Sequence, residues 1–421
     1  MLDIKFIRDN TELVKATVTN KNVKADIDKI LELDASKRKK QFEFDNLRAE
    51  QNRVSKEIAA FKKQKRDVSG IIKKMGELSK EIKTISSELS DINTKAENLL
   101  LAVPNIPHES VPVGKDEESN LFIREWGEKK KFDFEPKEHL ELAEINGLLD
   151  FKRATKLSGS MFAGYTGKGA QLERALINFM LNHQTQQNGY EEISLPFIVN
   201  RAAMTGTGQL PKMENDMYRI DEDDLFLIPT AEVPVTNYFA GEILSNDVLP
   251  QKFVAYSPCF RREAGSYGKD TRGLQRLHQF NKVEMVQFVK PEESYDVLEE
   301  MVKNAESVLQ ALGMHYRVVC LATGDLSFAS AKTYDIEVWA PGAQKYLEVS
   351  SISNFVDFQS RRASIRYRDE SGKVRFVHTL NGSGLATPRT YISLLENYQT
   401  TDGKIILPTK LQPYFNDKNT L

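Results

Sequence analysis

A polar segment between two strand-like stretches carries the residues best suited to phosphate chemistry. The sequence around Phe253 and the run that ends at Val289 predict two antiparallel strands, and the connection between them is too long for an ordinary hairpin loop. This connection holds five basic residues: Arg261, Arg262, Lys269, Arg272 and Arg276. Because guanidinium groups bind phosphate oxygens in pairs, such a hairpin can hold a polyphosphate. A solvated basic loop is the alternative interpretation.

Further residues of the same hairpin favour a nucleotide site. Arg261 and Glu263 come at the end of the first strand, where the backbone fixes the direction of their side chains. Phe280, on the returning strand, can present an aromatic face to a base, and Glu284 adds a carboxylate further along. An arginine, an aromatic ring and a carboxylate on one hairpin together indicate nucleotide binding.

Thr230, Ala231 and Glu232 directly follow an apolar strand and form a second candidate site. A hydroxyl and a carboxylate at a strand end are suited to bind an ammonium or another small polar group. The same three residues also fit a turn that caps a helix.

A hairpin around Pro341 and Gly342 supplies candidate metal ligands. Its second strand carries Glu348, Ser350 and Ser351. Carboxylate and hydroxyl oxygens are hard ligands of the kind that Mg²⁺ prefers when it is shared with a triphosphate. A strand with a polar face explains these residues equally well.

A Gly-rich turn near the C-terminal end precedes a helix that opens near Pro388. Ser383 lies in the turn, and Arg389 falls in the first turn of the helix. We therefore expect the Arg389 side chain to point toward the open end of the sheet.

Composition narrows the class of protein. The chain has 421 residues and a net charge of -2, so it can form two or three domains, and any nucleic-acid contact must come from local basic patches. Cys259 and Cys320 form no CxxC pair, and the six histidines show no metal-site spacing, which argues against a disulfide scaffold and a zinc site. Neither a signal peptide nor a membrane span is predicted. We expect a cytoplasmic protein.

Residues from about 27 to 100 predict an antiparallel hairpin of two long helices. The second helix has an apolar seam at alternating steps of four and three: Ile71, Met75, Leu78, Ile82, Ile85, Leu89, Ile92, Ala96 and Leu99. Residues 36–66 hold 11 Lys or Arg and 4 Asp or Glu, whereas residues 71–99 hold 5 of each. A basic helix of this kind can follow an RNA backbone, although oligomerisation is the alternative role of a coiled coil.

The hairpin from Phe253 to Val289, through its residues 260–285, resembles motif 2 of the class II aminoacyl-tRNA synthetases, in particular the bacterial-type seryl-tRNA synthetase family. Residues 171–199 are similar to motif 1, and the segment with Ser383 and Arg389 is similar to motif 3. The resemblance implies an α+β fold, in which helices flank a six- or seven-stranded antiparallel sheet and a coiled-coil arm precedes it. It divides the chain into a tRNA-binding domain (1–103), a linker (104–120) and a catalytic domain (121–421).

The resemblance also implies an activity and its partners. A homodimer would activate serine with ATP to seryl-adenylate and transfer it to tRNA(Ser), and charging of tRNA(Sec) stays open. The serine carboxylate is already a nucleophile, so catalysis would depend on positioning and on neutralising charge at the phosphates.

Residue roles carried over from the family fall into three groups. The catalytic arginines would be Arg261 at the α-phosphate and Arg389 at the γ-phosphate. ATP would also contact Arg262, Glu263, Leu277, Phe280, Glu348, Val349, Ser350 and Ser351, with Phe280 stacked on adenine and Mg²⁺ held by Glu348 and Ser351. Serine would lie among Thr230, Ala231, Glu232, Arg261, Glu284 and Ser383. The resemblance leaves open the role of Arg262, and whether Glu232 or Glu284 receives the ammonium group.

Two other functions are compatible with parts of the sequence. An enzyme that loads an amino acid onto a carrier protein would share the catalytic residues, but its known representatives lack the long basic hairpin. A non-catalytic RNA-binding paralogue would not need Arg261, Glu284, Glu348 and Arg389 together.

Overall fold

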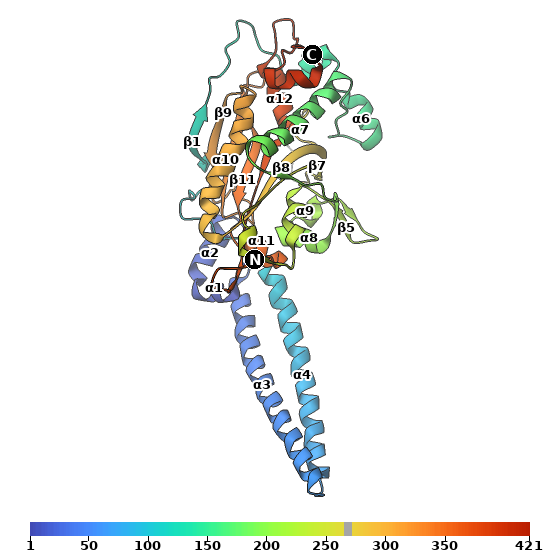
Figure 1. Cartoon of the computed structure of the whole chain (residues 1–421), viewed down its shortest axis with the longest axis vertical. Coiled ribbons are helices and arrows are strands. Elements are labelled where there is room, and N and C mark those ends of the chain that lie inside the picture. Colours follow the sequence, from blue (N-terminus) through green and yellow to red (C-terminus); the bar gives the residue numbers. More distant parts are fainter. Residues whose placement is uncertain (265–271) are drawn as a thin grey trace. The chain divides into compact units, whose positions relative to one another are not determined.

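The computed structural model describes residues 1–264 and 272–421, so Lys269 of the basic segment lies outside the described residues. The chain forms two compact units, Met1–Pro104 and Asn105–Leu421 (Figure 1). Over the described ranges, no helix is both long enough and apolar enough to cross a membrane.

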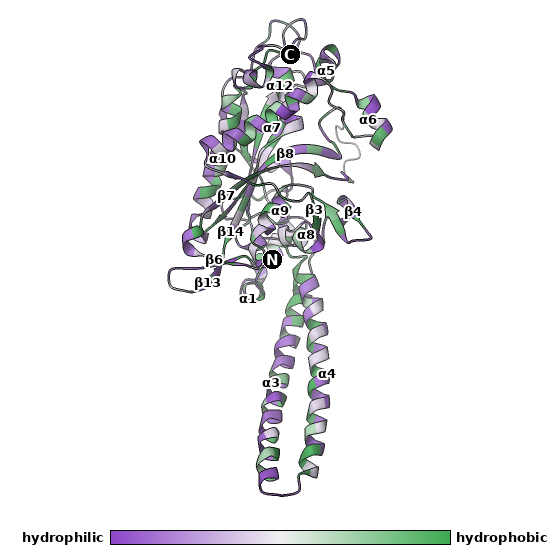
Figure 2. Ribbon diagram, turned by 45° about the vertical axis from the view of Figure 1, so that its right-hand side comes forward, coloured by the Kyte–Doolittle hydropathy of each residue, from purple (hydrophilic) through white to green (hydrophobic). Residues whose placement is uncertain are grey.

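The first unit consists of α1 (Ile4–Asp9), α2 (Thr11–Asn20), α3 (Ile27–Lys63) and α4 (Ser69–Leu100). The last two helices form the predicted antiparallel hairpin. Four leucine and isoleucine side chains of the predicted seam are buried along α4, at Leu78, Ile82, Ile85 and Leu89. A polar contact flanks this seam: Lys40 of α3 pairs with Glu88 of α4 at 2.5 Å. Hydrophilic residues dominate α3 in Figure 2, as its basic sequence requires.

A sheet of eight strands, counted over the described residues, organises the second unit. Its order is β1 (Leu121–Trp126), β9 (Tyr316–Cys320), β10 (Lys332–Ala340), β11 (Lys345–Asn354), β14 (His378–Ala386), β8 (Gln279–Val289), β7 (Gln251–Phe260) and β2 (Glu191–Glu192). All neighbours are antiparallel except β2 and β7. The sheet has more strands than the expected six or seven because it includes the two-residue β2, which pairs in parallel with β7 at the edge.

The two faces of this sheet differ in polarity. On β8, Val283 and Met285 are fully buried in the main hydrophobic core, which also contains side chains of α7 (Lys168–Gln187), α10 (Ser294–Ala311) and α12 (Thr387–Asn397). Since side chains alternate along a strand, Lys282 and Glu284 point to the opposite face. These helices cover one face, and the opposite face, the polar face, carries Lys282 and Glu284 beside a second apolar cluster that contains Val286 and Phe288.

Shorter elements surround the sheet. The helices are α5 (His139–Asn146), α6 (Phe151–Ser158), α8 (Arg201–Thr207), α9 (Glu232–Thr236) and α11 (Phe358–Ala363). Two small sheets contain β3 (Ile198–Asn200), β5 (Leu225–Leu227) and β4 (Arg219–Ile220), and β13 (Val374–Phe376), β12 (Arg366–Arg368) and β6 (Ile243–Ser245). The segment expected to link the domains belongs to the second unit from Asn105 onward, and the Asn105 amide donates hydrogen bonds to the carbonyls of Ala329 and Phe355.

Candidate active site

Arg261 lies where β7 leaves the sheet, and backbone contacts hold it in place. Its N–H donates to the His278 carbonyl (2.9 Å), and its Nε donates to the Pro229 carbonyl (3.3 Å). The guanidinium carbon lies 5.2 Å from the centroid of the Phe280 ring. Arg261 and Phe280 therefore form one unit, in which the cation and the aromatic face can contact the phosphate and the base of a nucleotide.

The next two residues of the predicted ATP site contact the protein itself. Arg262 donates from Nε to the Met217 carbonyl (3.1 Å), and its guanidinium carbon lies 5.1 Å from the Tyr218 ring centroid. Glu263 has a positive φ of 51° and pairs with Arg276 at 3.0 Å. Leu277, which was expected near the base, is buried in the main core.

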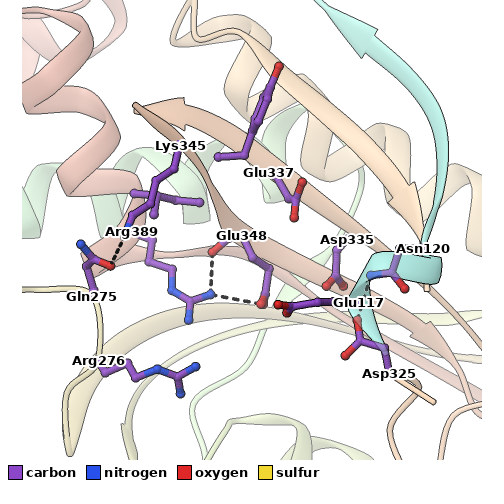
Figure 3. A pocket seen from close by; sticks show the side chains of 12 residues that line it. Glu117, Asn120, Gln275, Arg276, Asp325, Asp335, Glu337, Lys345, Glu348 and Arg389 are labelled. Carbon is purple, nitrogen blue, oxygen red and sulfur yellow. Dashed lines mark hydrogen bonds and ion pairs between the residues drawn. The ribbon is translucent and has the colours of Figure 1, made fainter. Parts of the chain in front are cut away.

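Arg276 and Arg389 line a cavity of about 460 Å³ beside this hairpin (Figure 3). Arg389 is the third residue of α12, and its Nη1 donates to the backbone carbonyl of Glu348 (2.9 Å) and to its carboxylate (3.1 Å). Lys345 adds a third cation to the lining, whereas Asp335 and Glu348 supply carboxylates. The cavity thus joins cations that can bind phosphates to oxygens that can bind a divalent metal ion.

An irregularity in β11 places two candidate metal ligands on one face. Ser350 pairs with Ile336 and Glu348 pairs with Glu337, so Val349 has no partner on β10. This bulge allows Glu348 and Ser351, three positions apart, to face the same side of the sheet, which strict alternation would forbid. The side chain of Val349 lies in the apolar core, and the Ser350 hydroxyl donates to the Ser383 carbonyl (2.5 Å). Any contact from Val349 to ATP must therefore use its backbone.

Glu232 lies on α9, which packs on the polar face through the apolar side chains of Ala231 and Val235. The Thr230 hydroxyl accepts the N–H of Glu232 (3.2 Å) in the turn that leads into α9, and the N-cap position itself is held by Ala231. Gln359 donates from Nε2 to Glu232 Oε1 (2.6 Å). The side-chain oxygen Oε1 of Gln359 in turn accepts a hydrogen bond from the Thr379 hydroxyl (2.7 Å), which fixes the direction of the Gln359 amide.

Glu284 and Ser383 are directly opposite each other on β8 and β14. Glu284 is 2% exposed and lies 2.5 Å from the ammonium of Lys282. Burial and the neighbouring Glu284 raise the pKa of Glu232 to about 7, although Lys282 and hydrogen bonds from Gln359 and Asn381 act in the opposite direction. Two carboxylates and one ammonium therefore lie close enough to affect one another, and Ser383 is opposite one of the carboxylates.

Five residues of these clusters were not predicted from the sequence: Lys282, Asp335, Lys345, Gln359 and Asn381. Lys282 and Asn381 each lie two positions before a predicted site residue on the same strand, so the period-two pattern could have identified them. Asp335 is opposite Ser351 on β10, and Gln359 comes from α11. Only strand pairing and helix packing bring these two residues to the site.

The fold and the site define a class of protein. The family described as "tRNA synthetase class II core domain (G, H, P, S and T)" matches residues 213–398, and the "Seryl-tRNA synthetase N-terminal domain" family matches residues 1–107. The chain is therefore a class II aminoacyl-tRNA synthetase.

Similar proteins narrow the family further. The chain is 55% identical to the serine–tRNA ligase of Thermodesulfovibrio yellowstonii, over 98% of each chain, and 51% identical to that of Syntrophobacter fumaroxidans, over 99% of each. The structure of seryl-tRNA synthetase from Pyrococcus horikoshii complexed with ATP has a TM-score of 0.92 at 40% identity, covering 99% of this chain and 98% of that one. The cytoplasmic serine–tRNA ligase from Naegleria fowleri, in complex with AMP, has a TM-score of 0.87 at 28% identity and covers 100% and 98%. The chain belongs to the seryl-tRNA synthetase family.

Proposed function

We propose that the chain activates serine with ATP and transfers the seryl group to tRNA(Ser), and we extend the proposal to tRNA(Sec). One observation carries the proposal: β8, which carries Glu284 of the cluster, pairs with β7, which leads into Arg261, and with β14, which leads into the helix of Arg389. The cluster offers partners for the ammonium and the hydroxyl of an amino acid, and the arginines can bind the phosphates to which that amino acid must be joined.

Activation needs no general base, because the serine carboxylate is already a nucleophile. Arg261 would hold the α-phosphate against this carboxylate, with adenine stacked on Phe280. Arg389 would bind the γ-phosphate, and before ATP binds its charge is balanced by Glu348. The contribution of these residues is to orient the reacting groups and to neutralise the charge that develops on the phosphates.

The site would recognise serine through its ammonium and its hydroxyl group. We assign its ammonium to Glu232, which has no ion pair among the described residues, and its hydroxyl to Glu284 and Ser383, which face each other across two strands. Alanine would leave the buried Glu284 carboxylate without its hydroxyl partner, and this cost excludes it.

Magnesium fits the acidic side of the cavity. Glu348 and Ser351 offer hard oxygen ligands, and the Oδ1 atom of buried Asp335, opposite Ser351, has no hydrogen-bond partner within the described ranges. Bound Mg²⁺ would neutralise phosphate charge. Glu348 and Ser351 would hold the metal ion, and the contact of Glu348 with Arg389 would keep this arginine beside the γ-phosphate.

Transfer requires tRNA, which we assign to residues 1–103, with residues 104–120 as the connection and residues 121–421 as the catalytic part. The surplus of 7 positive charges in residues 36–66 supports an RNA backbone contact by α3.

We also propose a homodimer, for which Leu121, Phe122 and Ile198 are exposed apolar candidates for the interface. The two cysteines are free and buried, which fits a cytoplasmic location.

Two assays on purified protein test the proposal. Exchange of labelled pyrophosphate into ATP should depend on serine, and charging should depend on tRNA(Ser). Removing residues 27–100 should leave serine-dependent exchange in place and abolish charging. Exchange that depends on another amino acid, or on none, would reject the proposed function. Equal loss of both activities in the deletion variant would reject the division of labour between the two units.

A further inference from the structure

Lys282 is a buried cation to which the contacts proposed above give no role. Its Nζ lies 2.5 Å from Oε2 of Glu284, and the two residues are 7% and 2% exposed. They are two positions apart on β8, so their side chains leave the same face of the sheet. A buried lysine costs free energy unless its charge is paired, and the charge here is paired with a residue of the proposed serine site.

The charges of the cluster do not balance without a ligand. The charges that act on Glu232 come from Glu284 and Lys282 on β8, and the guanidinium of Arg261 is assigned to the α-phosphate. The polar neighbours Gln359 on α11 and Asn381 on β14 carry no charge, and burial raises the pKa of the Cys259 thiol on β7, which stays neutral. With both carboxylates ionised, one ammonium leaves a single negative charge in a buried site. The ammonium of an amino acid supplies the missing positive charge.

We propose that Lys282 is a positioning residue that decides how the two carboxylates divide the groups of serine. Lys282 balances the charge of the Glu284 carboxylate by ion pairing at Oε2, and this oxygen accepts no hydrogen bond within the described ranges, so the carboxylate keeps an acceptor for the serine hydroxyl. Glu232, which pairs with no cation among the described residues, then receives the ammonium. The proposal rests on the proposed function and adds a residue that determines specificity.

Removal of the Lys282 charge should change how the site binds serine. Glu232 and Glu284 would then both need the single ammonium of the substrate, and Glu284 would turn away from the hydroxyl. Serine would lose the contact that distinguishes it from alanine, whereas alanine never used this contact. Discrimination between the two amino acids should therefore fall with little change in the binding of ATP.

Lys282→Met tests this prediction in the pyrophosphate exchange assay, with Lys282→Arg to retain the charge. Lys252→Met is the matched control, because Lys252 lies on β7 of the same sheet and pairs at 2.5 Å with Glu300 at the surface. We expect kcat/KM for serine to fall about 100-fold in Lys282→Met, a loss typical of removing one partner of a buried charge pair. The KM for ATP and kcat/KM for alanine should change less than about threefold, Lys282→Arg should recover part of the loss, and the control should match the wild type.

Two kinetic outcomes would overturn the proposal. An increase in the KM for ATP as large as the loss with serine would place Lys282 at the nucleotide. Equal losses with serine and alanine would reduce Lys282 to a general structural role.

A titration without substrates tests the charge pairing separately from catalysis. Carboxyl ¹³C resonances of labelled glutamate follow the ionisation of Glu232, with Glu232→Gln to assign the signal. The positive charge of Lys282 lowers the pKa of Glu232, so Lys282→Met should raise this pKa above about 7. An unchanged pKa would overturn the proposal even if serine exchange is normal. If Lys282→Met raises the pKa of Glu232 but the wild-type protein does not use serine in exchange, only the proposed function is rejected.

Discussion

Serine use should depend on pH through Glu232, whose carboxyl group has a pKa of about 7 instead of the ordinary 4.5. This rise corresponds to roughly 3 kcal/mol against ionisation in the free enzyme. Only the ionised carboxylate can pair with the ammonium of serine. At pH 6 about one tenth of the enzyme carries this form, so kcat/KM for serine should lie about tenfold below its alkaline plateau.

The sign of the effect follows from proton counting. Because the folded state holds this proton more tightly than the unfolded chain, the group stabilises the free protein below pH 4.5, and this contribution is lost as pH rises to about 7. Binding of serine reverses the preference, since its ammonium favours the ionised carboxylate. Serine binding near pH 6 should therefore release close to one proton per site.

Pyrophosphate exchange between pH 5.5 and 8.5 measures this dependence. The profile of kcat/KM for serine should rise to a plateau with a midpoint near 7, and the profile of kcat at saturating serine should have its midpoint at lower pH. Glu232→Gln should lose the acid limb and fall at least about 100-fold at the plateau. A flat wild-type profile, or an acid limb retained in Glu232→Gln, would refute the role of Glu232.

The other predictions concern the ATP site, the helical hairpin and the core. Arg389→Ala should reduce exchange by about 100- to 1000-fold, as expected for loss of one charge at the phosphates. Arg368→Ala, at an exposed strand, is the control and should leave exchange unchanged. Near-normal exchange in Arg389→Ala would contradict the γ-phosphate role. Replacing four exposed lysines of α3 by glutamine should raise the KM for tRNA about tenfold or more and reduce its salt dependence without affecting exchange; the positions are Lys37, Lys39, Lys56 and Lys63. Glu396→Leu should lower the free energy of unfolding by about 3 kcal/mol in urea titrations, because fully buried Glu396 accepts the N–H groups of His139, Gly342 and Ala343; a change below about 1 kcal/mol would show that these hydrogen bonds contribute little.

The sequence alone was sufficient to predict the elements that depend on local patterns. The helical hairpin could be predicted from the apolar seam of α4, because apolar residues that repeat every 3.5 positions over about four heptads are typical of a coiled coil. The strands around Arg261 and Glu284 and the start of α12 at Thr387 were also predictable, since alternation, glycine and proline act within a few residues. Motif spacing then indicated the family.

The tertiary structure decided which side chains meet. The bulge at Val349, which brings Glu348 and Ser351 to one face, depends on how β11 pairs with β10, and strict alternation predicts the opposite. The contact between Gln359 and Glu232 joins helices that are 127 positions apart in the sequence. Local patterns contain no information on such distances, and the raised pKa of Glu232 arises from burial and from Glu284, which only the packed sheet and helix bring close.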